Sequence, residues 1–189
     1  MEKENQIDIG ETIMSVKNNY FWTEKAVLSD FIANGDMLEI TRIFSYEEAF
    51  GLRFADIAVR FADRTEATEI ELTVILDTLL DDRASLDEER QNRLYEELYA
   101  FYSQDCSNKA IIKQAIKQDK HYNALQIKFA NALTCHKAQG GDWQTVFIQQ
   151  GFFSDDMLNT EYFRWLYTAV TRAKEKLYLV NFTEDFFAD

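Results

Sequence analysis

Apolar residues change their spacing twice along this chain of 189 residues, and these changes limit its fold more than any other feature. Between about residues 11 and 76, apolar and polar side chains alternate in short runs, as in Met37–Ile43, and polar turns such as Asn34-Gly35-Asp36 separate them. A period of two residues is typical of strands that bury one face. We therefore predict a small β-barrel or curled sheet, with strands at about 11–17, 37–43, 52–62 and 69–76.

Helical spacing follows in the middle of the chain. Apolar residues after residue 90 recur every three or four positions, and Ser85 and Glu88 fit a capping box, so we predict a helix over 86–103. A second helix is predicted over 108–119. Its outer face is a solvated surface or a weak phosphate contact, and it carries a stripe of four lysines: Lys109, Lys113, Lys117 and Lys120.

Beyond residue 127 the order becomes strand, helix, strand. Alternating side chains predict a strand near 127–133. Short apolar runs without alternation predict strands near 146–148 and 177–180, buried on both faces as in a sheet that helices cover on each side. A helix at about 160–173 separates the last two strands and carries an apolar stripe: Phe163, Leu166, Tyr167 and Val170. This order predicts a βαβ unit with a parallel sheet. The strands ending near 133 and starting near 144 need not be neighbours, because their connection is short for a parallel crossover.

Composition excludes several classes of protein. The hydrophobic fraction of 47%, with 15 Phe, 9 Tyr and 3 Trp, is too high for a disordered chain, and no apolar run reaches the ~20 residues of a membrane-spanning helix. The first ten residues are polar, unlike a secretory signal, so we expect a soluble, cytoplasmic protein without a membrane partner. Cys106 and Cys135 form no CxxC, and His121 and His136 lack metal-ligand spacing, so we expect reduced thiols and no metal site.

The net charge of −13 is distributed unevenly. Residues 1–108 contain 10 basic and 24 acidic side chains, whereas residues 109–189 contain 10 basic and 9 acidic ones. Phosphate binding depends on Lys and Arg, while an acidic total describes the long-range field rather than any one groove. The charge pattern therefore confines nucleic-acid binding to the C-terminal part or to local patches.

Two polar segments of the C-terminal part carry the candidate chemistry. The first, ALTCHKAQGGD over 132–142, follows a predicted strand and ends in two glycines that let the backbone approach a ligand. Polar groups at the carboxyl end of a strand lie where α/β sheets bind ligands; an ordinary polar connection with a helix cap at Gly140 is the alternative. The second, YTAVTRAK over 167–174, places Arg172 away from the apolar stripe, where its guanidinium could pair with a carboxylate or reach a phosphate.

Together these segments resemble a known family. ALTCHKAQGGDWQTVFI followed by LYTAVTRAKEKLYLV is similar to motifs V and VI of superfamily 1 DNA helicases, particularly the RecD-like branch. Upstream, GETIMSVKNNYFW and IANGDMLEI resemble the segments that lead into the small SH3-like insertion of that branch. The resemblance covers residues of about 10–43 and 127–181.

The resemblance implies an α/β fold: a RecA-like, P-loop NTPase-like parallel-sheet domain that lacks the P-loop and carries a small β-rich SH3-like insertion. It assigns residues 1–20 and 84–189 to the second RecA-like domain and residues 21–83 to the insertion. The sequence contains no GxxxxGK[ST] phosphate loop, so the first RecA-like domain, which binds most of ATP and Mg²⁺ in such helicases, is expected to be a partner. We expect an excised or split-gene C-terminal portion that is inactive alone.

The resemblance also implies roles for single residues. Four side chains are expected to bind single-stranded DNA, along which these helicases move from 5′ to 3′. Thr134 and His136 are expected to face the DNA backbone, and Lys137 and Gln139 flank them. Two residues are expected near ATP, where relatives often carry Glu in place of the Asp: Gly140 and Asp142. Arg172 corresponds to the arginine finger, a donor fork that stabilises charge on the transferring phosphoryl group.

The sequence is also compatible with two other classes of function. A non-catalytic protein- or nucleic-acid-binding module on a helicase-like scaffold fits the acidic first part of the chain and the missing phosphate loop. A stand-alone nuclease or other hydrolase is disfavoured, because no carboxylate cluster stands with a His or Lys at a strand end. Trp22 and Trp143 could stack on bases, but large aromatic side chains near glycine turns more often fill a core.

Overall fold

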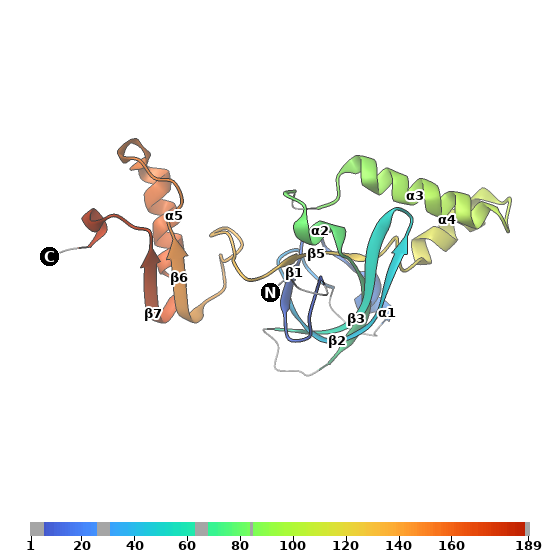
Figure 1. Ribbon diagram of the computed structural model, residues 1–189, viewed down its shortest axis with the longest axis horizontal. Helices are drawn as coiled ribbons and strands as arrows, with labels where there is room; N and C mark the ends of the chain where they lie inside the picture. Colours follow the sequence, from blue (N-terminus) through green and yellow to red (C-terminus); the bar gives the residue numbers. More distant parts are fainter. Residues whose placement is uncertain (1–5, 26–30, 63–67, 84, 188–189) are drawn as a thin grey trace. The chain divides into compact units, whose positions relative to one another are not determined.

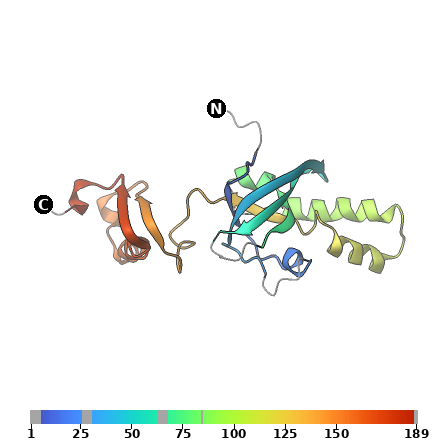
Figure 2. The same ribbon diagram turned by 90° about the horizontal axis from the view of Figure 1, so that it is seen from below.

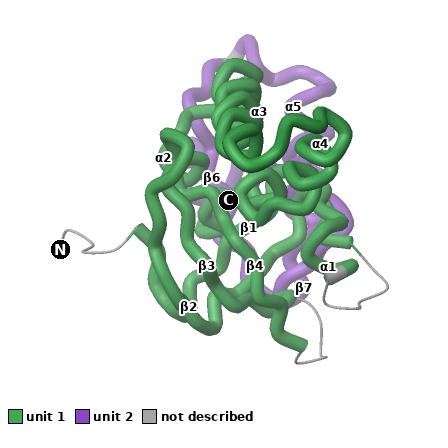
Figure 3. Tube along the Cα trace, turned by 90° about the vertical axis from the view of Figure 1, so that its right-hand side faces the viewer, with its two compact units in different colours: residues 1–131 green, residues 132–189 purple. Residues whose placement is uncertain are grey.

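The computed structural model describes residues 6–25, 31–62, 68–83 and 85–187. The chain divides into two compact units, Met1–Asn131 and Ala132–Asp189 (Figure 3). None of the helices in these described ranges is long and apolar enough to cross a bilayer.

Five strands of the first unit close into a barrel in the order β1-β2-β3-β4-β5 (Figures 1 and 2). Each neighbouring pair is antiparallel except β4 and β5, which run parallel and complete the ring with β1. The bounds are β1 (Thr12–Ser15), β2 (Met37–Ala49), β3 (Leu52–Phe61), β4 (Ile70–Ile75) and β5 (Leu125–Phe129). The predicted barrel is thus confirmed, but it draws strands from both sides of the segment 21–83. The division after Asn131 therefore differs from the predicted domain boundaries.

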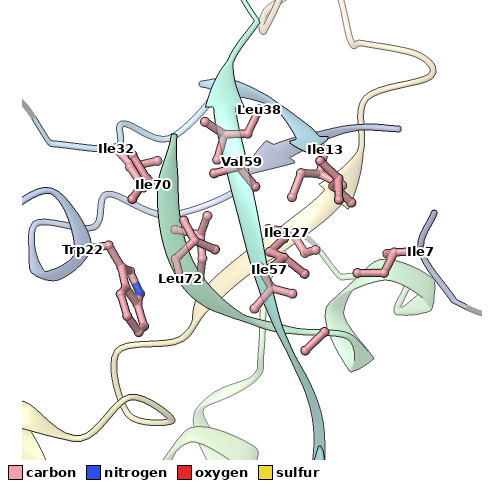
Figure 4. Close-up of a cluster of buried hydrophobic side chains, with 14 of the residues drawn as sticks. Ile7, Ile13, Trp22, Ile32, Leu38, Ile57, Val59, Ile70, Leu72 and Ile127 are labelled. Carbon is pink, nitrogen blue, oxygen red and sulfur yellow. The ribbon is translucent and has the colours of Figure 1, made fainter. Parts of the chain in front are cut away.

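The barrel interior is filled by branched aliphatic side chains on alternate strand positions, as the period of two predicts (Figure 4). Ile13, Ile57 and Ile127, from three different strands, are fully buried there. The helix α1 (Phe21–Lys25) adds Trp22 to this core, where the side chain is 5% exposed and its Nε1 donates to the carbonyl of Asn123 at 2.8 Å. Trp22 is therefore a core residue and not a base-stacking platform.

Three helices separate β4 from β5: α2 (Asp77–Leu80), α3 (Glu88–Ser103) and α4 (Lys109–Gln118). The last two form a hairpin that projects from one side of the barrel (Figure 1) and confirm the predicted helices. Asp87 caps the start of α3, and its side chain accepts from the backbone N–H of Arg90. The predicted capping box at Ser85 is therefore wrong. Asn108 caps the start of α4. Leu98 and Ile116 are buried between hairpin and barrel.

A buried histidine fixes this hairpin to the barrel. The His121 ring lies between the carboxylates of Asp119 and Glu47, with its Nδ1 3.2 Å from Asp119 Oδ1 and its Nε2 3.1 Å from Glu47 Oε2. Burial alone would lower the pKa of His121, but hydrogen bonds to the two carboxylates raise it above its ordinary value. The neighbouring Lys120 pairs with Glu47 and Asp56 at 2.9 and 3.0 Å. We refer to these five residues as the His121 cluster.

The second unit contains β6 (Trp143–Gln149), α5 (Thr160–Val170) and β7 (Ala173–Val180). The two strands pair in parallel around the intervening helix, which confirms the predicted βαβ unit. The predicted burial is wrong, however, because Phe147 of β6 is 68% exposed and Tyr167 of α5 is 69% exposed. A sheet of two strands with one helix is too narrow to cover these side chains, so the apolar runs that indicated full burial lie open on this unit.

Candidate nucleic-acid and nucleotide site

The segment 134–142, here called the motif V loop, is a series of tight turns. The backbone N–H of Ala138 donates to the carbonyl of Thr134, and that of Gly141 donates to the carbonyl of Ala138. Gly140 has φ of +93°, a conformation that favours glycine. The loop leads into the amino end of β6, since the preceding strand β5 belongs to the barrel. The loop thus follows a strand, as expected, but that strand belongs to the barrel and not to the parallel sheet of β6 and β7.

The second glycine of the pair is required by an aromatic neighbour. A Cβ atom on Gly141 would lie 2.6 Å from Cη2 of Trp143, well inside van der Waals contact. The indole therefore lies directly over the glycine backbone. Trp143 packs against the motif V loop, so this face of its ring is not open to stacking by a base.

Arg172 is joined to the motif V loop by a hydrogen bond. Its Nη1 donates to the carbonyl of Gly141 at 2.9 Å, and its Nε donates to the carbonyl of Thr168 at 3.0 Å. Nη2 donates to the Thr171 hydroxyl at 3.1 Å. The helix ends at Val170 with Thr171 as its cap, so Arg172 stands in the turn before β7 and not on the predicted helix. No carboxylate in the described residues pairs with it, which leaves the predicted salt-bridge alternative without a partner.

The acidic residue of the loop is neutralised locally. Asp142 Oδ1 lies 2.7 Å from Nζ of Lys174, the second residue of β7. Two contacts thus join the motif V loop to the start of β7: Arg172 to Gly141 and Lys174 to Asp142. Arg172 thus contacts Gly141, which lies in the chain between Gly140 and Asp142, the two other residues that the resemblance places near ATP.

A pocket of about 670 Å³ opens between the motif V loop and α5. We call it the α5 pocket; the loop contributes His136 and Gln139 to its lining, and the helix contributes Glu161, Tyr162, Arg164 and Trp165. The other two residues expected to bind DNA, Thr134 and Lys137, are exposed on the same loop but do not line it. Two of the four predicted DNA-binding residues therefore line the pocket and two do not.

Two side chains that line the α5 pocket, Cys135 and Tyr162, are hydrogen-bonded within the protein. The Cys135 thiol donates to the carbonyl of Trp165 at 3.4 Å, and burial raises the pKa of this thiol against the opposing charge of Arg172. The Tyr162 hydroxyl accepts from Nε2 of the buried Gln150 at 2.6 Å. Sequence reasoning missed the helix side of the pocket. The available signal was the polar face of the amphipathic helix, where Arg164 lies opposite the apolar stripe.

One segment of the chain is similar to a known protein family. Residues 129–180 match the UvrD-like helicase C-terminal domain. This helicase segment contains the motif V loop, the βαβ unit and Arg172, and it supports the resemblance to superfamily 1 helicases. A search of the curated proteins finds no match to the chain.

The segment that matches the family model has a guanidinium group that suits a phosphate. Across the ranges that the structure describes, no three His, Cys, Asp or Glu residues gather closely enough to hold a metal. Arg172 has five N–H donors, three of which are used by Gly141, Thr168 and Thr171. The remaining donors form a short fork that suits a phosphate oxygen.

Proposed function

We propose that this chain is the C-terminal part of an ATP-dependent superfamily 1 DNA helicase of the RecD-like branch, which moves 5′ to 3′ on single-stranded DNA. One observation carries the proposal: within the matched helicase segment, Arg172 donates to the carbonyl of Gly141 and so couples motif VI to motif V. In this account, residues 132–189 belong to a second RecA-like domain. The exposed apolar side chains of β6 and α5 support a larger parallel sheet that further strands and helices complete.

Arg172 is proposed as the arginine finger of the intact enzyme. Bound ATP supplies the phosphoanhydride bond that is hydrolysed, and a first RecA-like domain supplies the phosphate loop and the Mg²⁺ ligands. Arg172, positioned by its three backbone and hydroxyl contacts, directs its free donors at the γ-phosphate. Lys174 offsets the charge of Asp142, which would otherwise repel a triphosphate beside Gly140.

The motif V loop is proposed to bind the DNA strand. Thr134, His136, Lys137 and Gln139 are exposed, and they lie in the part of the chain whose charges nearly balance. The barrel, whose closed ring of short strands is compatible with an SH3-like insertion, lies in the acidic part. The division of charge along the chain therefore favours the C-terminal part over the acidic part for DNA contact.

The test is ATP hydrolysis with the chain supplied together with the first RecA-like domain of a RecD-like helicase. Arg172→Ala should reduce single-strand-stimulated hydrolysis about 10³-fold, as removal of an arginine finger does. Lys176→Ala, which removes an exposed cation from β7, is the matched control and should retain the rate. Equal rates for the two variants would refute the assignment of Arg172.

A non-catalytic binding module is the second candidate, favoured by the 24 acidic side chains of residues 1–108. It predicts that the chain restores no hydrolysis to a first RecA-like domain, with or without DNA. Finding a phosphate-loop motif upstream in the same reading frame would eliminate it.

A further inference from the structure

The α5 pocket presents planar and polar side chains that the protein does not use. Within the described part of the chain, no hydrogen bond or ion pair engages the side chains of His136, Gln139, Glu161 or Arg164. Trp165 adds an indole to the same lining. Its volume of about 670 Å³ falls in the range of small-ligand sites. Free amide, carboxylate and guanidinium groups beside aromatic rings indicate a flat, polar ligand.

The charges of the pocket disfavour a phosphate as this ligand. Glu161 contributes a carboxylate that would repel it, and the Asn159 side-chain oxygen already accepts from two backbone N–H groups at the start of α5. A nucleobase suits the same groups, because aromatic rings and guanidinium planes stack on bases. Amides and carboxylates hydrogen-bond the edges of bases.

We propose that the α5 pocket binds one unstacked base of the single-stranded DNA. Within the motif V loop, Thr134 and Lys137, which do not line the pocket, then contact the phosphates, and Gln139 contacts the base. His136, which the resemblance places beside the DNA backbone, lines the same pocket and so lies where backbone and base meet. Arg164 and Glu161 of α5 complete the base site. This inference rests on the proposed function, since it requires that the DNA strand follows the motif V loop.

The test compares two oligonucleotides of equal length, one of thymidines and one of abasic residues, which carry the same phosphates. Fluorescence anisotropy with the full chain should give at least about fivefold tighter binding of the thymidine strand. Arg164→Ala and Glu161→Ala change the net charge in opposite directions, so their absolute affinities should diverge. Both should nevertheless bring the ratio of the two affinities close to one.

Lys137→Ala is the matched control, because Lys137 is exposed on the loop and does not line the pocket. It should weaken the binding of both strands equally and leave their ratio unchanged, because a phosphate contact does not discriminate between them. Trp165→Phe, which retains an aromatic ring, should remove most of the tryptophan quenching that accompanies binding of the thymidine strand.

Each alternative result has a separate meaning. Equal binding of the thymidine and abasic strands by the unaltered chain overturns the base pocket and leaves the proposed helicase function standing. Absence of binding to either strand at low salt overturns both proposals. Adenosine monophosphate tests a free nucleotide as the source of the base; quenching of Trp165 by this nucleotide but not by the DNA strand overturns the assignment to DNA.

Discussion

Asp119 of the His121 cluster offers the sharpest prediction of stability. Its carboxylate is 11% exposed and accepts from the backbone N–H of His121 at 2.7 Å and from the Tyr102 hydroxyl at 2.8 Å. Burial favours the neutral acid, but the hydrogen bonds from His121, Tyr102 and the backbone favour the anion more and lower the pKa of Asp119 from 3.8 to about 2. By linkage, this difference corresponds to about 2.5 kcal/mol of folding free energy at neutral pH.

The direction of the pH dependence follows from the lowered pKa. Because the folded chain binds the Asp119 proton less readily than the unfolded chain, the contribution is complete above about pH 5 and is lost progressively as the pH falls through about 2. Asp119→Asn should therefore lower the free energy of unfolding by about 2–3 kcal/mol at pH 6. The difference from the unaltered protein should shrink progressively at acid pH.

Urea unfolding followed by circular dichroism between pH 2 and pH 7 measures both quantities. Asp105→Asn is the control, because Asp105 is exposed after α3 and its replacement should cost less than about 0.5 kcal/mol. A difference for Asp119→Asn that stays constant with pH, or that equals the control, would refute the hydrogen-bonding account of the His121 cluster.

Three further predictions concern other parts of the chain. Because the pKa of His121 is raised in the folded state, its charge stabilises that state fully below about pH 6.5. This contribution is lost as the pH rises through the folded-state pKa, so unfolding curves of His121→Gln should converge on those of the unaltered protein at alkaline pH. Gly141→Ala should displace the indole of Trp143, cost about 1–3 kcal/mol in the second unit and weaken strand binding without changing the barrel's circular dichroism. Single-strand binding should fall linearly on a plot of log affinity against log salt, and a flat line would contradict phosphate contacts from the motif V loop.

Local elements of this fold were predictable from the sequence because their physical cause is local. The period of two along Met37–Ile43 and the helical period after residue 90 report directly which side chains share a face. The helix and strand order beyond residue 140 likewise predicted the βαβ unit, which the parallel pairing of β6 with β7 confirms.

Closure of the barrel could not be predicted in the same way. β1 and β5 are separated by more than a hundred residues, and their pairing, with Ile13 opposite Phe129, depends on long-range contacts that no local pattern reports. The end of α5 is a finer example. Thr171 turns its hydroxyl back onto the carbonyl of Tyr167, so the helix stops before Arg172 and the guanidinium reaches Gly141 instead of projecting from a helix face.

The loop residues of the candidate site were predictable from the sequence, but the residues that α5 contributes were not. The sequence motif pointed to His136, Gln139 and Arg172, and the structure places the first two at one pocket and the third against the glycine pair. Arg164 and Trp165 were missed because helix periodicity separates buried from exposed positions without showing which exposed positions meet a neighbouring loop.

The central claim is that the motif V loop, hydrogen-bonded to Arg172, binds single-stranded DNA and also lies beside ATP in the intact enzyme. Its most direct measurement is single-strand-dependent ATP hydrolysis by the chain paired with a first RecA-like domain, with the maximal rate and the half-saturating DNA concentration determined separately. Arg172→Ala should lower the maximal rate about 10³-fold at an unchanged half-saturating concentration, whereas His136→Ala should raise that concentration and spare the rate. Identical effects of the two substitutions on both quantities would contradict the account.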